Sequence, residues 1–365
     1  MVAIMYTNSR RNLIRTIFLG ALIGIFAPSS PTWAESKFQD PLDTPALMRN
    51  AVNTRPLMAI AHAGAHLVAV GSRGLIVRSE DQGKTWTQSA VPVQCDLLAV
   101  HFPTPQLGWV VGHDGVILHS SDGGKNWTKQ FDGRIADGAF KKYYAAATTD
   151  AAMTAAAAQV AQNFKAGPAL PYLDVWFEDT EKGFVVGSFG MLAATVDGGK
   201  TWEPWLHRID NAQGVNLNSI RNVGGNIYIV GERGILFKLD RANRRFQKME
   251  TGYAGSFFGI VGNTDALVAF GLRGIAYRSG NGGANWEALK MPVDATITAG
   301  VVSRESANIV LVTSADQILL GDAQGRSFKL VHPHKPMRYT GIALVDRGTA
   351  VVTGLDGVRT ETLSQ

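Results

Sequence analysis

The chain of 365 residues contains one cysteine, Cys95, so it cannot form a disulfide bond within itself. Packing and hydrogen bonds must therefore supply its stability, even in an oxidising compartment. The chain also lacks a P-loop, a Gly-x-Ser-x-Gly motif and a Cys-x-x-Cys motif. These absences remove the sequence signatures of phosphate-binding loops, serine hydrolases and dithiol redox sites.

A strong charge of either sign is missing as well. The chain has 35 lysines and arginines against 30 acidic residues, a net charge of +5. Three of the arginines lie within residues 1–34, which carry no acidic residue, so the rest of the chain has 32 basic and 30 acidic residues, or +2. This balance gives no bulk attraction for nucleic acid, and nucleic acid is not an expected partner.

The apolar segment at residues 16–27 is too short for a lasting membrane span. Three arginines precede it, and Thr32-Trp33-Ala34 follows it with small residues at the first and third positions. This order is typical of a secretory signal peptide. We therefore expect residues 1–34 to be removed on export by the Sec or the twin-arginine route. No cysteine lies near the cleavage point, so a lipid anchor is not expected.

Glycine is plentiful, with 40 residues, and much of it falls in a repeat. Seven segments share an apolar strand, a Gly-x-x-Gly-like turn, a second strand, an Asp/Gly-rich turn and an aromatic residue. Their second residues are spaced by 41, 75, 44, 40, 42 and 41 positions, and they are Gly71, Gly112, Gly187, Gly231, Gly271, Thr313 and Gly354. A period of about 40–45 residues is that of one four-stranded propeller blade.

Each repeat also follows an apolar strand, such as residues 97–100, so four strands are available in each unit. The sequence thus predicts an all-β fold, a seven-bladed β-propeller of four-stranded blades over residues 35–365. The seventh repeat ends after three strands, near Leu363. Because a closed ring has no free edge only if its last blade is complete, we expect residues 35–50 to supply the missing outer strand.

A Ser/Thr-x-Asp-x-Gly-x-Thr/Asn-Trp box, the Asp-box, closes the clearest repeats. Its aspartate can accept backbone N–H bonds across the turn, its glycine can take a positive φ, and its aromatic ring can wedge between blades. We interpret these boxes as structural and not as catalytic. Their main residues are Asp81, Trp86, Asp122, Trp127, Asp197, Trp202 and Trp286.

The spacing of 75 residues between the second and third repeats is longer than one blade. The excess lies in residues 131–170, and its alanine-rich part, 137–165, predicts a helix or helical hairpin between blades two and three. Met153, Val160 and Phe164 lie on one stripe at helical spacing. This stripe either takes part in partner binding or only packs on the propeller.

The tandem Val-Gly-x-x-Gly-x-Ile/Leu turn and Ser-x-Asp-Gly-Gly-Lys-Thr/Asn-Trp box, behind a twin-arginine-like signal, resemble the photosystem II stability/assembly factor family over about residues 40–363. The resemblance implies a BNR-repeat propeller that is not an enzyme and has no cofactor. It implies a location in the periplasm, or in the thylakoid lumen of a phototroph. Such a protein binds a subunit of a membrane-protein complex through basic residues and helps that complex assemble; in a heterotroph we expect another envelope complex, such as a transporter. We expect a monomer.

Strand order puts the turns between the second and third strands of all blades on one face, and the Asp-box turns on the other. The third turn position is arginine in blades one, four and five and acidic in blades two, six and seven. Arginine suits carboxylates, anionic lipids and interface carbonyls, although these side chains could also be solvated or paired within the molecule. The partner-binding candidates are Arg73, Arg233, Arg273, Glu232, His113 and Asp114.

A second class of function is a sialidase-like glycan hydrolase or a glycan-binding propeller. The repeat count of seven and the absence of a Phe/Tyr-Arg-Ile-Pro segment argue against a sialidase. Asp174 and Glu178 are the nearest candidates for a carboxylate pair, and they do not stand out for glycoside chemistry. His62 and His66 flank a predicted turn, so no metal site is expected.

Overall fold

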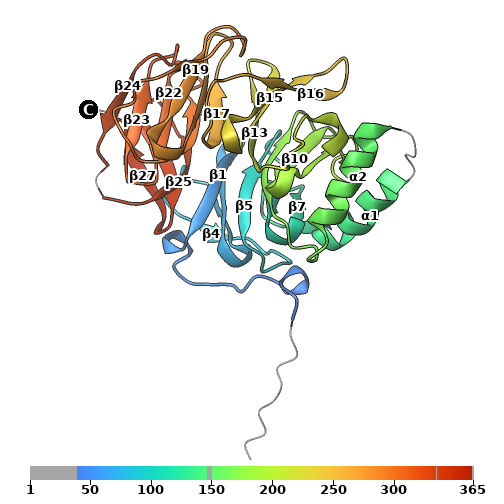
Figure 1. Cartoon of the computed structure of the whole chain (residues 1–365). Helices are drawn as coiled ribbons and strands as arrows, with labels where there is room; N and C mark the ends of the chain where they lie inside the picture. Colours follow the sequence, from blue (N-terminus) through green and yellow to red (C-terminus); the bar gives the residue numbers. More distant parts are fainter. Residues whose placement is uncertain (1–38, 146–149, 334, 364–365) are drawn as a thin grey trace, which may run out of the picture. The chain divides into compact units, whose positions relative to one another are not determined.

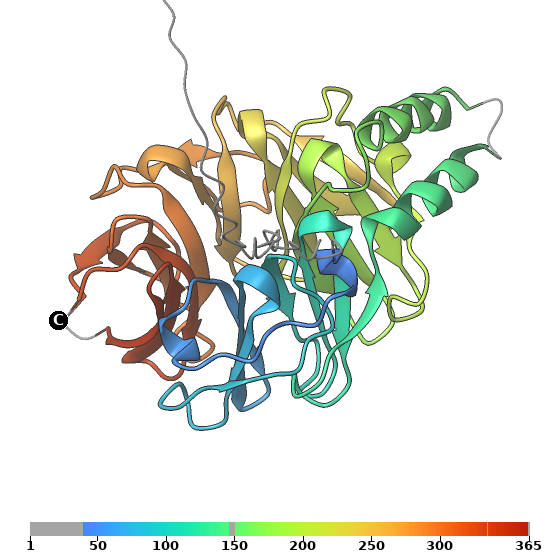
Figure 2. The same ribbon diagram turned by 90° about the horizontal axis from the view of Figure 1, so that it is seen from below.

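The computed structural model describes residues 39–145, 150–333 and 335–363, so the predicted signal peptide at 1–34 lies outside it. Seven antiparallel sheets stand around a ring (Figures 1 and 2), six with four strands and one with three. Within each sheet the strands pair in chain order, and the first strands of neighbouring sheets contact one another around the ring. The predicted seven-bladed propeller is confirmed.

The strands fall into consecutive groups, one to a blade. Blade one has β1 (Leu57–Ala63), β2 (His66–Gly71), β3 (Ile76–Ser79) and β4 (Thr87–Gln88), and blade two has β5 (Leu97–His101), β6 (Gly108–Gly112), β7 (Ile117–Ser120) and β8 (Thr128–Phe131). Blade three has β9 (Tyr172–Phe177), β10 (Gly183–Gly187), β11 (Leu192–Thr195) and β12 (Glu203–Pro204), and blade four has β13 (Leu217–Val223), β14 (Asn226–Gly231), β15 (Leu236–Asp240) and β16 (Arg245–Met249). Blade five has β17 (Phe257–Gly262), β18 (Leu267–Gly271), β19 (Ala276–Ser279) and β20 (Glu287–Ala288), and blade six has β21 (Ile297–Val302), β22 (Ile309–Thr313), β23 (Ile318–Gly321) and β24 (Phe328–Val331). Blade seven has β25 (Tyr339–Leu344), β26 (Thr349–Gly354) and β27 (Gly357–Thr362).

The hydrophobic core is divided among the spaces between blades. In β6 all five residues, Gly-Trp-Val-Val-Gly, are buried, as expected for a strand that other blades cover on both faces. One cluster joins Val68 and Ile76 of blade one to Val110 and Leu118 of blade two. Each such side chain contributes about 1.5–3 kcal/mol when it is buried, so contact between blades is what holds the ring together.

The prediction that residues 35–50 complete blade seven is wrong for the part that the structure describes. The last sheet contains only β25, β26 and β27. Residues 39–56, here called the N-terminal strap, form no strand and contain two short 3₁₀ turns, η1 (Pro41–Asp43) and η2 (Val52–Thr54). Pro41 and Pro45 have no backbone N–H to give to a strand ladder, which explains the failure.

The strap instead lies along blades two and one and reaches blade seven, where η2 contacts β27 without joining its sheet. Leu42 is buried against Val91 and Val93, and the Ala46 N–H donates to the Val91 carbonyl at 2.9 Å. The seam between blades seven and one is closed by the packing of β1 against β25 and β26. The Thr340 hydroxyl also donates to the Leu57 carbonyl across this seam at 2.6 Å.

The predicted insertion is a pair of helices, α1 (Gly133–Ala145) and α2 (Ala151–Asn163), between blades two and three. Helix α1 begins before residue 137 because the Asp132 carboxylate caps it, accepting from the Arg134 and Ile135 N–H groups at 2.9 and 3.2 Å. The pair packs beside blade three, at the periphery of the ring (Figure 2). No helix among the described residues is long and apolar enough to span a membrane.

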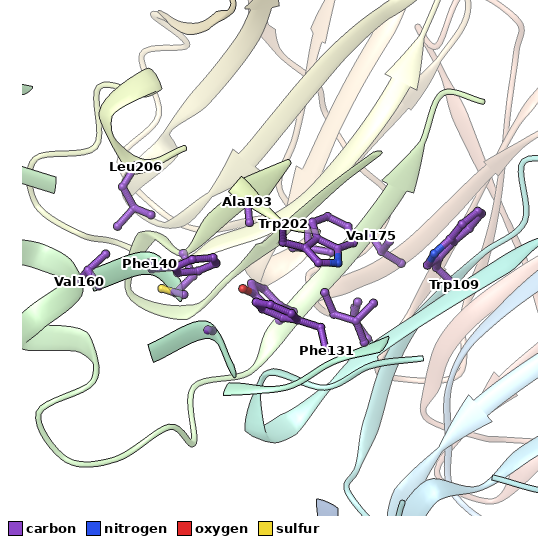
Figure 3. Packing of buried hydrophobic residues seen from close by; sticks show 14 of the residues in the cluster. Trp109, Phe131, Phe140, Val160, Val175, Ala193, Trp202 and Leu206 are labelled. Atoms are coloured by element: carbon purple, nitrogen blue, oxygen red, sulfur yellow. The ribbon is translucent and has the colours of Figure 1, made fainter. Parts of the chain in front are cut away.

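The apolar stripe of the insertion faces inward. Val160 of this stripe is fully buried with Phe140 of α1, in one cluster with Phe131, Trp202 and Leu206 (Figure 3), and Phe164 lies in the same cluster with Met153 packed against it. The alternative in which this stripe packs on the propeller is therefore the observed one. The insertion is part of the core between blades two and three, and its apolar stripe is not available as an exposed anchor.

Candidate binding face

Five blades carry the same turn between their second and third strands. The third residue of each turn has a left-handed backbone with φ between 52° and 58°, and it is Arg73, Asp114, Phe189, Arg233 or Arg273. A glycine with positive φ follows each of them, which is the type I′ pattern of tight hairpins. A non-glycine residue in this conformation costs on the order of 1 kcal/mol. We call the face that carries these turns the turn face.

The turn backbone also links one blade to the next. The Arg73 N–H donates to the Asp96 carboxylate at 2.7 Å, and Asp96 lies in the connection from blade one to blade two. The Phe189 N–H likewise donates to the Asn216 side-chain oxygen, in the connection to blade four, at 2.8 Å. Backbone bonds therefore fix the turn, and the side chains of Arg73, Phe189, Arg233 and Arg273 are exposed.

The three arginines are exposed on this face, as the strand order predicted. The Arg233 guanidinium donates to the Gln213 side-chain oxygen at 2.8 Å. Among the described residues, the guanidinium groups of Arg73 and Arg273 form no hydrogen bond or ion pair. Arg233 and Arg273 belong to the adjacent blades four and five, whereas Arg73 lies on blade one.

The other predicted site residues have contacts within the protein. The Glu232 carboxylate accepts from the backbone and side-chain N–H groups of Asn216 at 3.1 and 3.2 Å. The His113 N–H donates to the Asp96 carbonyl at 2.8 Å. Asp114 lies near Cys95, where burial and the negative charge of Asp114 raise the pKa of the thiol to about 12. Glu232 thus holds Asn216, whose side chain bonds to blade three, and His113 and Asp114 lie beside Arg73, not beside Arg233.

A groove of about 550 Å³ lies between α2 and the connection from blade three to blade four. The sequence did not predict it. Phe189, at the third position of the blade-three turn, lines it with 56% of its surface exposed. Gln159 and Asn163 of α2 donate to the Phe189 carbonyl at 2.9 and 3.1 Å. Gln213 also lines the groove, and because it accepts from Arg233, the groove adjoins the arginines of blades four and five.

A family model described as "Photosynthesis system II assembly factor YCF48" matches residues 52–167 and 154–315 of the chain. The chain belongs to this family.

Two curated relatives match parts of the chain. "Photosystem II assembly lipoprotein Ycf48" of Synechococcus sp. (strain CC9902) is 31% identical over 120 residues, which are 32% of this chain and 36% of the relative. "Uncharacterized protein YkuO" of Bacillus subtilis (strain 168) is 42% identical over 41 residues, which are 11% of this chain and 14% of the relative. The chain therefore spans about a third or less of the length of the curated relatives that it matches.

Solved structures with the same fold cover most of the chain. "YCF48 bound to D1 peptide" superposes with a TM-score of 0.62 at 16% identity, covering 88% of this chain and 100% of that one. "YCF48 from Cyanidioschyzon merolae" gives 0.59 at 16% identity, with 87% and 98% covered. The WD40 propeller domain of Doa1 gives 0.60 at 9% identity, with 89% and 97% covered. At these identities the likeness concerns the fold.

In this family member the Asp-box turns lie on the face opposite the turn face. The Asp81 carboxylate accepts from the Thr85 N–H at 2.9 Å, from the Thr85 hydroxyl at 2.6 Å and from the Ser79 hydroxyl at 2.8 Å. These bonds, led by that of the Thr85 side chain, lower the pKa of Asp81 to about 2. Asp122 and Asp197 have equivalent bonds within their own turns.

The aromatic residues of the boxes pack between blades. Trp127 lies in the cluster between blades one and two, and Trp202 in the cluster between blades two and three. Trp86 packs at the seam of blades seven and one, and Trp286 between blades four and five. The boxes therefore close hairpins and fill the spaces between blades.

The carboxylate pair considered for glycoside chemistry is engaged elsewhere. Asp174 is buried and accepts from the Ser219 hydroxyl at 2.8 Å, from the Ile220 N–H at 2.9 Å and from Arg221. Glu178 pairs with Arg241 at 2.5 Å. Both carboxylates thus join blade three to blade four.

The central channel, about 350 Å³, is lined by the innermost strands of the ring. Of the two histidines that line it, His62 and His101, the second accepts from the Phe177 N–H at 3.0 Å, and burial lowers the pKa of His101 to about 3. A histidine with this pKa stays neutral at ordinary pH and cannot act as a general acid there. Among the described residues, no group of three or more His, Cys, Asp or Glu side chains could hold a metal ion.

Proposed function

We propose that this protein is a non-enzymatic, extracytoplasmic, monomeric binding protein that helps a membrane-protein complex to assemble or remain stable. Membership of the YCF48 family supports this proposal, and one relative of the same fold is described as bound to a D1 peptide. In a phototroph the complex is photosystem II, and in a heterotroph it is another envelope complex, such as a transporter. The name lipoprotein of one relative and the signal-like residues 1–34 support a periplasmic or lumenal location.

The proposed binding surface is the part of the turn face that contains Arg233, Arg273 and the groove beside α2. One observation carries this choice: these arginines occupy left-handed backbone positions that glycine would occupy without strain. Strained residues whose side chains make few internal contacts point to a role outside folding. Arginine together with an exposed aromatic residue, here Phe189, is also the usual composition of an interface hot spot.

Site-specific photocrosslinking in membranes of the source organism tests this surface. A photoreactive residue at Phe189, on the rim of the groove, should crosslink to one subunit of an integral membrane complex. The same residue at Lys200, in an Asp-box turn on the opposite face, is the matched control and should give no such product. Crosslinks from position 200 alone, or to soluble proteins alone, would contradict the proposal.

A further inference from the structure

The N-terminal strap brings two further arginines to the turn of blade one. Gln88 of β4 holds the strap, because its side-chain oxygen accepts from the Arg49 N–H at 2.9 Å and its side-chain nitrogen donates to the Leu47 carbonyl at 3.0 Å. Arg49, Arg55 and Arg73 then line one hollow of about 210 Å³. Arg49 and Arg55 are distant from Arg73 in sequence, and only the course of the strap unites them.

The two halves of the strap differ in charge. In the first half, Asp40 and Asp43 pair with Arg134 at 3.3 and 2.7 Å, and Asp43 pairs with Lys129 at 3.0 Å. Among the described residues, the guanidinium groups of Arg49 and Arg55 in the second half, and that of Arg73 in the adjoining turn of blade one, form no ion pair or hydrogen bond. The Asp96 carboxylate at this turn accepts from the Arg73 backbone N–H. The hollow is therefore a cluster of three unpaired positive charges.

Two apolar side chains project beside this cluster. Leu47 and Met48 are consecutive in the strap and are 59% and 67% exposed. Exposed apolar side chains of this size are less stable in water than in an apolar environment, so their burial is favourable. They do not line the hollow. An apolar pair next to unpaired arginines is the composition of protein surfaces that lie in the interface of an anionic bilayer.

We propose that this part of the turn face binds the surface of a lipid bilayer that contains anionic phospholipids. A headgroup phosphate occupies the hollow between the three arginines, whose planar forks match phosphate oxygens. Leu47 and Met48 enter the boundary between headgroups and acyl chains. A hollow of about 210 Å³ is below the size of pockets that enclose a drug-sized ligand, so it suits one phosphate group of a surface.

This binding would orient the turn face toward the membrane, which contains the complex of the proposed function. Of the partner-binding candidates predicted from the sequence, the lipid site uses Arg73. Arg233, Arg273 and the groove beside α2 stay with the protein partner. The lipid site thus extends the proposed function without depending on the identity of that partner.

Co-sedimentation with vesicles tests the proposal. The full chain should bind vesicles of phosphatidylcholine and phosphatidylglycerol at low salt, and it should not bind vesicles of phosphatidylcholine alone. The triple variant Arg49→Gln, Arg55→Gln, Arg73→Gln should bind the anionic vesicles at least tenfold less tightly. The matched control Lys84→Gln, Lys125→Gln, Lys200→Gln removes the same charge from exposed side chains of the Asp-box face and should bind like the wild type. Equal loss by both triple variants would overturn the site.

A second pair of measurements separates other occupants of the hollow. The variant Leu47→Ser with Met48→Ser should bind anionic vesicles severalfold less tightly. Its remaining binding is electrostatic, so less added salt should be needed to abolish it than to abolish the binding of the wild type. If inorganic phosphate raises the melting temperature of the wild type but not of the arginine variant, while vesicles do not bind, the hollow is a site for free phosphate and the proposal fails. The lipid site and the partner site are distinguished because the arginine variant should retain crosslinking from position 189.

Discussion

The two faces of this propeller are built from turns of the same repeat, but they differ in whether the polar side chains of the turn are bonded within the protein. In the Asp-box turns, the aspartate is saturated by bonds within its own turn, as Asp81 is by Thr85 and Ser79. On the turn face, the backbone N–H of Arg73 makes the link to the next blade, and its side chain is left unpaired. A repeat can therefore devote one face to folding and leave the other open to binding.

The largest expected effect concerns the Asp-box side. Trp202→Ala should lower the free energy of unfolding by about 3–5 kcal/mol, because Trp202 is buried between blades two and three and packs edge-on against Phe177. Chemical denaturation measures this loss. Trp202→Phe retains an aromatic ring and should lose less. A loss below about 1 kcal/mol for the alanine variant would contradict a structural role of the box.

The next effect concerns the turn face and appears in binding, not in stability. Arg233→Gly with Arg273→Gly should weaken capture of the crosslinked subunit by about 2 kcal/mol, roughly thirtyfold. The free energy of unfolding should stay within about 1 kcal/mol of the wild type, because relief of the left-handed strain offsets the greater chain entropy of glycine. A pull-down titration and a denaturation curve measure the two quantities.

Lys200→Ala serves as the control for this double variant. It removes a charge from an Asp-box turn and should change neither quantity. Undiminished capture by the double glycine variant would mean that the two arginines do not contribute to binding. An equal loss with Lys200→Ala would mean that the two faces do not differ in the proposed way.

The smallest effect is a dependence on pH. Asp81 has an ordinary pKa of 3.8 and a folded-state pKa of about 2, so the folded protein favours its charged form. Its contribution to stability is therefore full above about pH 4 and is lost as pH falls through about 2. Asp81→Asn should flatten the decline of the melting temperature between these pH values. An unchanged slope would mean that other carboxylates control the acid transition.

The blades and the insertion could be predicted from sequence because their signals are local. Each of these turns contains a glycine, so the spacing of Gly71, Gly112 and Gly187 indicates the length of each blade and the position of the insertion. Helical spacing in residues 137–165 likewise depends only on neighbours along the chain. The side of the ring on which Arg233 and Arg273 lie follows from strand order alone.

The remaining features depend on contacts between distant residues. Leu42 is held by Val91 and Val93, and no pattern near Leu42 indicates this, although Pro41 and Pro45 did argue against a strand. Arg49 was missed because residues 35–50 were expected to form a strand of blade seven, and Arg55 is brought to Arg73 only by the course of the strap. The groove beside α2 exists because Gln159 reaches the Phe189 carbonyl, a contact between residues of different segments.

The three-stranded seventh blade has a mechanical consequence. Every other junction of the ring is crossed by the chain passing from one blade to the next, whereas blades seven and one meet through side-chain packing, the contact of η2 with β27, the Thr340 bond and the bond from the His62 ring to the Leu344 carbonyl at 2.8 Å. Within the described residues, no strand of one end lies in the sheet of the other. The ring is thus closed by non-covalent contacts between its first and last blades, without a strand shared between them. Pulling on the ends of the chain would part this seam first and then peel the blades away one at a time from either end.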